Sequence, residues 1–151
     1  MSEPGPQACS RDFPGTIEAA AEAEAWLVSQ SGALGLAADT EFAINLCLEE
    51  LFINAVRHGH ANRVTISIWS ESDAVRVEFV DDGGPFDPTG APAKRISGPA
   101  HDFEIGGFGT GLVQKFSQRI SYRRSDGHNR LLLEFSAHPN ANSGPPSQRA
   151  T

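Results

Sequence analysis

The sequence predicts an α+β fold, a two-layer sandwich in which one mainly antiparallel (mixed) sheet has helices packed on one face. Two segments, 16–32 and 39–58, have the composition and apolar spacing of helices. Two short segments, 64–68 and 75–79, alternate apolar and polar residues with the period of a strand, and two more, 120–122 and 131–135, are also expected as strands. The four fall into two pairs, each joined by a turn. Strands linked as hairpins, with helices kept apart from them, favour this sandwich over a parallel sheet.

Both expected helices have start and stop signals. The first begins at Thr16, whose side chain is a plausible N-cap, and it extends toward Gly32. The second begins at Asp39 or Thr40, and Gly59 ends it.

The strands form two expected hairpins. Residues 71–73 join the first pair, and Asp126-Gly127, a favoured hairpin dipeptide, joins the second. The expected strands are 64–68, 75–79, 120–122 and 131–135.

Length and charge limit the kind of protein this can be. A chain of 151 residues is the size of one domain. We expect residues 1–11 to be a disordered N-terminus, 12–136 the folded domain and 137–151 a disordered tail, because both ends lack apolar periodicity. With 12 Lys and Arg against 19 Asp and Glu, the net charge of −7 argues against broad nucleic-acid binding, which needs a basic surface.

Other features of the sequence suggest a cytoplasmic location. No apolar run approaches the roughly 18 residues of a membrane helix, and the polar, acidic start lacks the pattern of a signal peptide. Cys9 and Cys47 lie in unrelated contexts, so neither a disulfide framework nor a cysteine metal site is expected. We therefore expect a soluble, cytoplasmic protein that contacts neither membrane nor nucleic acid directly.

The second expected helix carries a polar pair beside its apolar stripe. Glu50 and Asn54 are four residues apart, so their side chains stack on one side of the helix, whereas Glu49 faces water. An Asn oxygen suits Mg²⁺, which takes few protein ligands and keeps phosphate and water oxygens. A carboxylate one turn away can accept a proton from a hydroxyl group. Taken alone, such a pair is more often a solvated residue beside a polar boundary residue.

A second candidate segment, 80–88, directly follows a strand. Asp81, at the strand end, can accept a hydrogen bond from an exocyclic amine, and Gly83 lets a flat ring approach the backbone because it has no Cβ. Acidic residues followed by glycines also make ordinary turns, and that explanation is favoured for this segment by itself.

A third segment, 106–113, places glycines before a helix expected over 108–116. Backbone N–H groups at a helix start attract an anion. Leu112 replaces the third glycine of a dinucleotide fingerprint, and no Gly-Lys-Ser/Thr follows as in a P-loop. The stretch 83–106 before it has no periodicity, which is typical of a functional lid or a disordered insert. For the glycines alone, a hinge without a ligand is the plainer explanation.

Together the three segments carry a resemblance. A helix with Glu-x-x-x-Asn-Ala, a strand ending Asp-x-Gly-x-x-Phe-Asp-Pro, a long lid, and Gly-x-Gly before a helix resemble the GHKL (Bergerat-fold) ATP-binding superfamily over residues 12–136. Within it, the sequence is most similar to anti-sigma-factor serine/threonine protein kinases of the RsbW type, including its ending over 122–135.

The resemblance implies a role for each matched residue. It assigns Mg²⁺ binding to Asn54 and general-base catalysis on a substrate Ser or Thr to Glu50. It assigns Asp81 to the adenine amine, with Gly83 beside the ring. The residues it assigns to the ATP phosphates are Gly107, Gly109, Thr110 and Gly111.

The resemblance also implies a function and partners. It implies an ATP- and Mg²⁺-dependent serine/threonine kinase that acts as an anti-sigma regulatory factor in a partner-switching system. The implied partners are a sigma factor or comparable regulator, a STAS-type anti-sigma-factor antagonist as substrate, and a second copy in a homodimer. Two alternatives stay open: a non-catalytic ATP-binding interaction module and a histidine-kinase-type ATPase domain. The presence of Glu50 argues modestly against the first.

Overall fold

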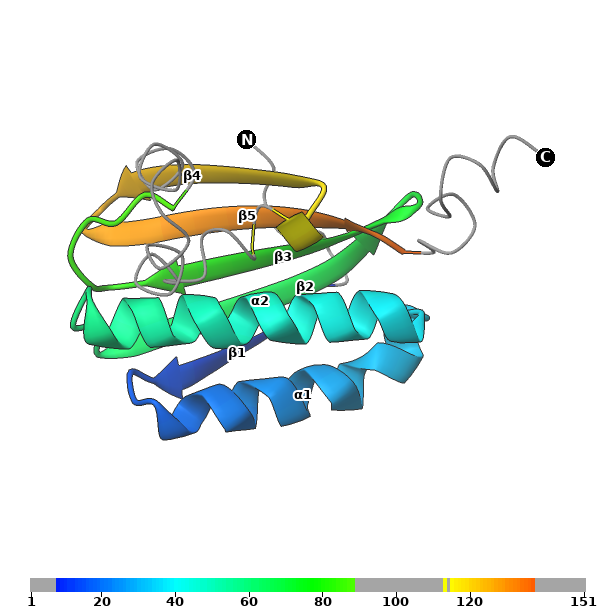
Figure 1. Cartoon of the computed structure of the whole chain (residues 1–151), viewed down its shortest axis with the longest axis horizontal. Helices are drawn as coiled ribbons and strands as arrows, with labels where there is room; N and C mark the ends of the chain where they lie inside the picture. Colours follow the sequence, from blue (N-terminus) through cyan, green and yellow to red (C-terminus); the bar gives the residue numbers. More distant parts are fainter. Residues whose placement is uncertain (1–7, 89–112, 114, 138–151) are drawn as a thin grey trace, which may run out of the picture.

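The computed structural model describes residues 8–88, 113 and 115–137. In these residues a five-stranded sheet carries two helices that lie side by side on one face (Figure 1). The expected α+β sandwich is confirmed, and every strand pair described is antiparallel, so the sheet is not mixed there. The elements are β1 (Cys9–Pro14), α1 (Glu18–Leu34), α2 (Ala38–Arg57), β2 (Arg63–Glu71), β3 (Ala74–Asp81), β4 (Arg119–Ser125) and β5 (His128–Ser136).

The strand order places the two hairpins next to each other. It runs β1-β2-β3-β5-β4, so β3 of the first hairpin pairs with β5 of the second. In this pairing Asp81 lies directly opposite Asn129. In the second hairpin, Asp126 and Gly127 have φ of 54° and 76°. Both positive values are those of a type I′ turn, which confirms the expected Asp-Gly connection.

The edge strand β1 was not expected from the sequence. Residues 1–11 were expected to be disordered, but residues 9–11 pair with β2, and this part of the expectation is wrong. Of the six residues in β1, Phe13 alone is buried, so the strand has no period-two pattern to reveal it. At the other end, the backbone N–H of Ala137 donates to Asp73, so the sheet region extends one residue beyond 136. Residues 1–7 and 138–151 lie outside the described residues.

The helix ends differ slightly from the expected ones. The N-cap position of α1 is Ile17, although the Thr16 hydroxyl still accepts a hydrogen bond from the Ala19 N–H at 3.2 Å. This helix continues to Leu34, past the expected end, because Gly35 supplies the left-handed C-cap with φ 68°. The second helix, α2, begins one residue before the expected Asp39.

The core lies between the helices and the inner face of the sheet. Phe52 of α2 is fully buried and contacts Phe13 and Phe79 edge-to-face, with ring centroids 6.1 and 5.9 Å apart. Aromatic pairs in this arrangement add to the free energy gained from burial alone. The contacts fix α2 against both the edge and the centre of the sheet. The expected apolar stripe of α2 is confirmed, since its members are all buried: Leu48, Leu51, Phe52 and Ala55.

A close backbone contact joins the end of α2 to the end of β3. The N–H of Gly84 donates to the carbonyl oxygen of Gly59 at 2.9 Å. A Cβ added to Gly83 would lie 2.7 Å from that same oxygen, closer than real Cβ atoms approach. Glycine therefore lets the two backbones meet. The contact holds the helix end that carries Asn54 beside the strand end that carries Asp81.

We expect the substitution Gly83→Ala to lower the free energy of unfolding by about 1–3 kcal/mol, because the added methyl group overpacks this contact. Gly32→Ala is the matched control, since a Cβ at Gly32 meets nothing within 4 Å. Placed inside α1, it should instead raise stability by about 0.5–1 kcal/mol. Urea denaturation of the purified variants measures both, and equal midpoints for Gly83→Ala and the parent protein would contradict the role of the contact.

Candidate functional site

The candidate site lies where the second half of α2 meets the end of β3 and the start of β5 (Figure 1). Glu50, Asn54, Asp81 and Gly83 are among the described residues. The other residues named from the sequence lie outside them: Gly107, Gly109, Thr110 and Gly111.

The side chain of Asn54 is buried without a hydrogen bond. It is 2% exposed, and neither its amide oxygen nor its amide nitrogen has a partner within the described part of the chain. Leaving a buried polar group unpaired costs about 1–3 kcal/mol, so such groups in native proteins call for an explanation. A cation held by the amide oxygen, with phosphate oxygens completing its coordination, satisfies that oxygen. The residue therefore fits the Mg²⁺ ligand that the resemblance implies.

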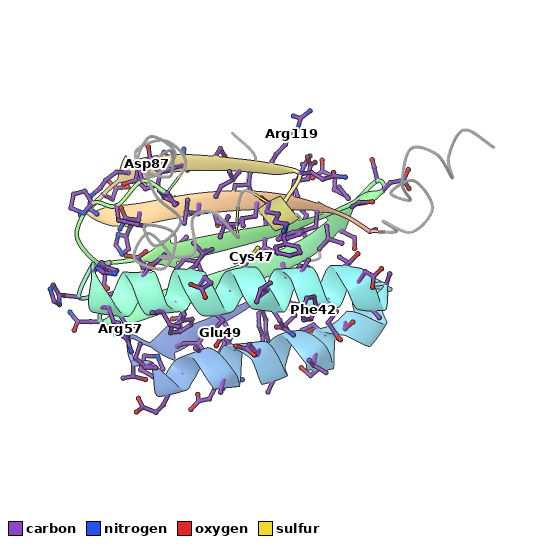
Figure 2. All side chains as sticks on the ribbon, in the orientation of Figure 1. Phe42, Cys47, Glu49, Arg57, Asp87 and Arg119 are labelled. Atoms are coloured by element: carbon purple, nitrogen blue, oxygen red, sulfur yellow. The ribbon has the colours of Figure 1, made fainter. Side chains whose placement is uncertain are left out.

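Glu50 lies one turn before Asn54 and is half-buried. Burial, with a further contribution from the negative charge of Glu49, raises the pKa of the Glu50 carboxyl above its ordinary value. A carboxylate with a raised pKa binds a proton more strongly, which suits a general base. Glu49 is exposed on the side of α2 that faces α1, as Figure 2 shows. The pKa of Glu24, on α1, is raised mainly by burial and further by the negative charge of Glu49. The two neighbouring glutamates thus have different surroundings.

Cys47 lies one turn before Glu50, between α2 and the sheet (Figure 2). It is 1% exposed, and burial, together with the charge of Glu50, raises the pKa of its thiol to about 12. A thiol with that pKa stays protonated at neutral pH and is a poor nucleophile. Cys47 is therefore a packing residue.

Asp81 presents its two carboxylate oxygens differently. It is 5% exposed, and its Oδ1 accepts hydrogen bonds from the Gly83 N–H at 2.8 Å and from Asn129 Nδ2 at 3.0 Å. Within the described ranges, Oδ2 accepts none, so it is the oxygen left for a ligand. Burial raises the pKa of Asp81, and the hydrogen bonds from Asn129 and Gly83 oppose this. The carboxylate can accept a hydrogen bond from an amine in a sheltered position.

Two features of the site, at Gly83 and Asn129, were not expected from the sequence. Gly83 was placed beside a ligand ring, but the described residues give a separate reason for glycine, the approach of the Gly59 carbonyl. Asn129 received no role, although it is 3% exposed and bonded to Asp81. The available signal was a polar residue at an inward position of β5, in line with the buried Leu131 and Leu133.

A cavity of about 390 Å³ lies at the opposite end of α2, away from Asn54. It is bordered by Thr40 and by Phe42, whose side chain is 63% exposed. Thr40 donates to the Ser136 carbonyl at 2.8 Å and so joins the start of α2 to the end of β5. None of the residues named from the sequence as site residues borders this cavity.

Two features are absent from the described residues. These residues contain no group of three or more His, Cys, Asp or Glu side chains placed to hold a metal ion. None of the described helices has the length and apolarity to span a bilayer.

Comparison with known proteins gives a family for the chain. Residues 13–135 match the family described as the histidine kinase-like ATPase domain. The serine/threonine-protein kinase BtrW of Bordetella bronchiseptica is 30% identical over 102 residues, which are 65% of this chain and 72% of the relative.

Solved structures share the fold at low sequence identity. The RsbU and RsbW domains of Rv1364c from Mycobacterium tuberculosis match with a TM-score of 0.56 and 16% identity over 85% of this chain. The histidine kinase domain of the blue-light activated kinase EL346 from Erythrobacter litoralis matches with a TM-score of 0.50 and 17% identity over 84%. The matches span 31% and 63% of those chains. At these identities the likeness is one of fold alone.

The family match spans most of the chain, and the 30% identical relative is covered over more than two thirds of its length. The described fold also has the antiparallel sheet and the helix layer of this family. The chain therefore belongs to the histidine kinase-like ATPase domain family, of the GHKL type, and is similar to the serine/threonine-protein kinase BtrW.

Proposed function

We propose that this chain is an ATP- and Mg²⁺-dependent serine/threonine protein kinase. The family is one of kinase-like ATPase domains, and the relative BtrW is named a serine/threonine-protein kinase. The observation that carries the proposal is the buried amide of Asn54, which has no hydrogen-bond partner among the described residues and lies one helical turn from the half-buried Glu50. A purely structural helix residue gains nothing from an amide in that position.

In this proposal each side chain has one task. Asn54 binds Mg²⁺ through its amide oxygen, and Glu50 accepts the proton of the attacking Ser or Thr hydroxyl. Asp81 accepts a hydrogen bond from the adenine amine through Oδ2, and Gly83 lies beside the ring. When bound, Mg²⁺ neutralises charge on the phosphate oxygens, which is the main requirement of phosphoryl transfer. The proposal assigns the phosphates to residues outside the described ranges: Gly107, Gly109, Thr110 and Gly111.

The proposed protein partners follow from the RsbW-like resemblance. The chain binds a sigma factor or a comparable regulator, and it phosphorylates a STAS-type anti-sigma-factor antagonist. Competition between the two partners sets the output of a partner-switching circuit, and the kinase acts as a homodimer.

The chemistry of the phosphorylated product separates this proposal from the two alternatives, a histidine-kinase-type domain and a non-catalytic interaction module. Acid-stable phosphate on the antagonist supports it, acid-labile phosphate indicates a histidine-kinase-type domain, and binding without transfer indicates an interaction module.

The substitution Glu50→Gln should lower the rate of phosphoryl transfer by about 10²–10⁴-fold, because it removes the general base. Affinity for Mg·ATP should stay close to that of the parent protein. The measurement is transfer of label from ATP to STAS-domain proteins of the same genome. Glu49→Gln, on the adjacent exposed residue, is the matched control and should keep the parent rate. Equal transfer rates for Glu50→Gln and Glu49→Gln would rule out Glu50 as the base.

The transfer rate should also depend on pH through Glu50. A general base acts only when deprotonated, so the rate should rise with pH as Glu50 loses its proton. Because the pKa of Glu50 is raised above its ordinary 4.5, the midpoint of this acid limb should lie above that value. Single-turnover rates across a pH series test this. The residual transfer rate of Glu50→Gln should not show this rise with pH. If the rise persisted in that variant, it would belong to another titrating group.

The substitution Asn54→Leu should separate stability from function. Because Leu has nearly the same volume and no unpaired polar atoms, the free energy of unfolding should rise by about 1–3 kcal/mol. A ligand that binds only the folded state raises the melting temperature, and the rise caused by Mg·ATP should be lost in this variant. Thermal melts with and without Mg·ATP measure both effects. A variant that is less stable than the parent protein would show that the amide has a structural partner.

A further inference from the structure

A polar cluster around the buried Asn129 connects the end of β3 to the β4–β5 hairpin. At its centre is Asn129, the second residue of β5, which lies directly opposite Asp81 in the sheet. It is 3% exposed, and both ends of its carboxamide are bonded. Its Nδ2 donates to Asp81 Oδ1 at 3.0 Å and to the Gly84 carbonyl at 2.8 Å.

The other end of the carboxamide faces donors. Asn129 Oδ1 accepts hydrogen bonds from Tyr122 Oη at 2.6 Å and from Arg124 Nη1 at 3.1 Å. It also accepts from the backbone N–H of Phe86 at 3.3 Å. Because these three groups donate, the amide oxygen must face them, and the NH₂ group is the end presented to Asp81. The orientation of Asn129 is thereby determined by its neighbours.

The hairpin also holds the backbone that follows Asp81. Arg124 Nη1 donates to the Gly83 carbonyl at 2.8 Å, and its Nη2 reaches the Gly127 carbonyl at 3.3 Å. Together with the bonds that Asn129 makes to Gly84 and Phe86, this anchors the loop after β3 at three backbone groups. A network in which each member satisfies another is rigid, and its effect exceeds that of one isolated pair.

This arrangement has a consequence for the carboxylate. Asp81 Oδ1 is occupied by the Asn129 and Gly83 donors, so the ligand-facing acceptor is Oδ2. Burial raises the pKa of Asp81, and among the groups that oppose burial, the hydrogen bond from Asn129 has the largest effect. Without that bond the carboxyl would hold a proton at higher pH and turn more freely. A protonated carboxyl both donates and accepts, so it would no longer select an amine over a carbonyl on a nucleobase.

We propose that Asn129 is a positioning residue: it holds Asp81 so that one ionised oxygen is kept for a nucleobase amine, and Tyr122 and Arg124 hold Asn129 in place. This inference rests on the proposed binding of ATP by Asp81. In this proposal the preference for adenine over other nucleobases depends on the β4–β5 hairpin as well as on Asp81 at the end of β3.

The test compares the affinities for Mg·ATP and Mg·GTP, measured by calorimetric titration of the full chain across a pH series. In Asn129→Ala the affinity for ATP should fall about 10- to 100-fold, as expected for a lost hydrogen bond to a charged group. The affinity for GTP should change little, so the ratio of the ATP affinity to the GTP affinity should fall. Raising the pH should restore part of the ATP affinity, because it ionises Asp81 again. A merely structural role would lower both affinities together and show no recovery with pH.

Two further variants keep the test decisive. Tyr122→Phe removes only the hydroxyl that donates to Asn129 Oδ1. It should lower the ratio of ATP affinity to GTP affinity by a few-fold, and this result is available even if Asn129→Ala fails to fold. Arg123→Ala, beside Arg124 on the exposed side of β4, is the matched control and should keep the parent preference. An ATP preference unchanged in Tyr122→Phe and in folded Asn129→Ala would overturn the inference while the proposed kinase stands. A parent protein that binds neither nucleotide would overturn the kinase proposal and this inference with it.

Discussion

The candidate site depends on one backbone contact, the hydrogen bond from the Gly84 N–H to the Gly59 carbonyl. Asn54 and Asp81 are far apart in sequence and lie on different kinds of element, a helix and a strand. Their elements end close together because glycine at 83 leaves room for the Gly59 carbonyl. The contact is made by backbone atoms on both sides and depends on the lack of a side chain at Gly83. It therefore fixes the position of the end of α2 relative to the end of β3 without involving the side chains of Asn54 and Asp81.

Two buried asparagines show how the same side chain serves opposite purposes. The amide of Asn129 is bonded at both ends and joins three segments of the sheet region. The amide of Asn54, equally buried, has no partner among the described residues. Burial of an unpaired amide is costly, and burial of a fully bonded one adds rigidity. A bonded amide of this kind is part of the scaffold, whereas an unpaired one is suited to a ligand that supplies the missing partner.

Much of the local structure could be predicted from the sequence, because local patterns determine it. The type I′ turn at Asp126-Gly127 needs two residues that accept positive φ, and this dipeptide does so. The apolar stripe of α2 predicted its buried face. The strand at 9–14 could not be predicted, because its ladder partners are residues 63–68 of β2 and its own side chains are mostly exposed. Because only one side chain of this strand is buried, its sequence has no alternation of apolar and polar residues, and its pairing with β2 depends on residues far along the chain.

By itself the sequence determined the kinds and the order of the described elements from α1 onward, and it pointed to Glu50, Asn54 and Asp81 as candidate site residues. Only the tertiary structure decided that Asn54 is buried without a hydrogen-bond partner in the described part of the chain, and that Asn129 donates a hydrogen bond to Asp81. Burial and hydrogen bonding between distant segments depend on which strands become neighbours. The pairing of β3 with β5 puts Asp81 opposite Asn129, and no local pattern in either strand encodes that register.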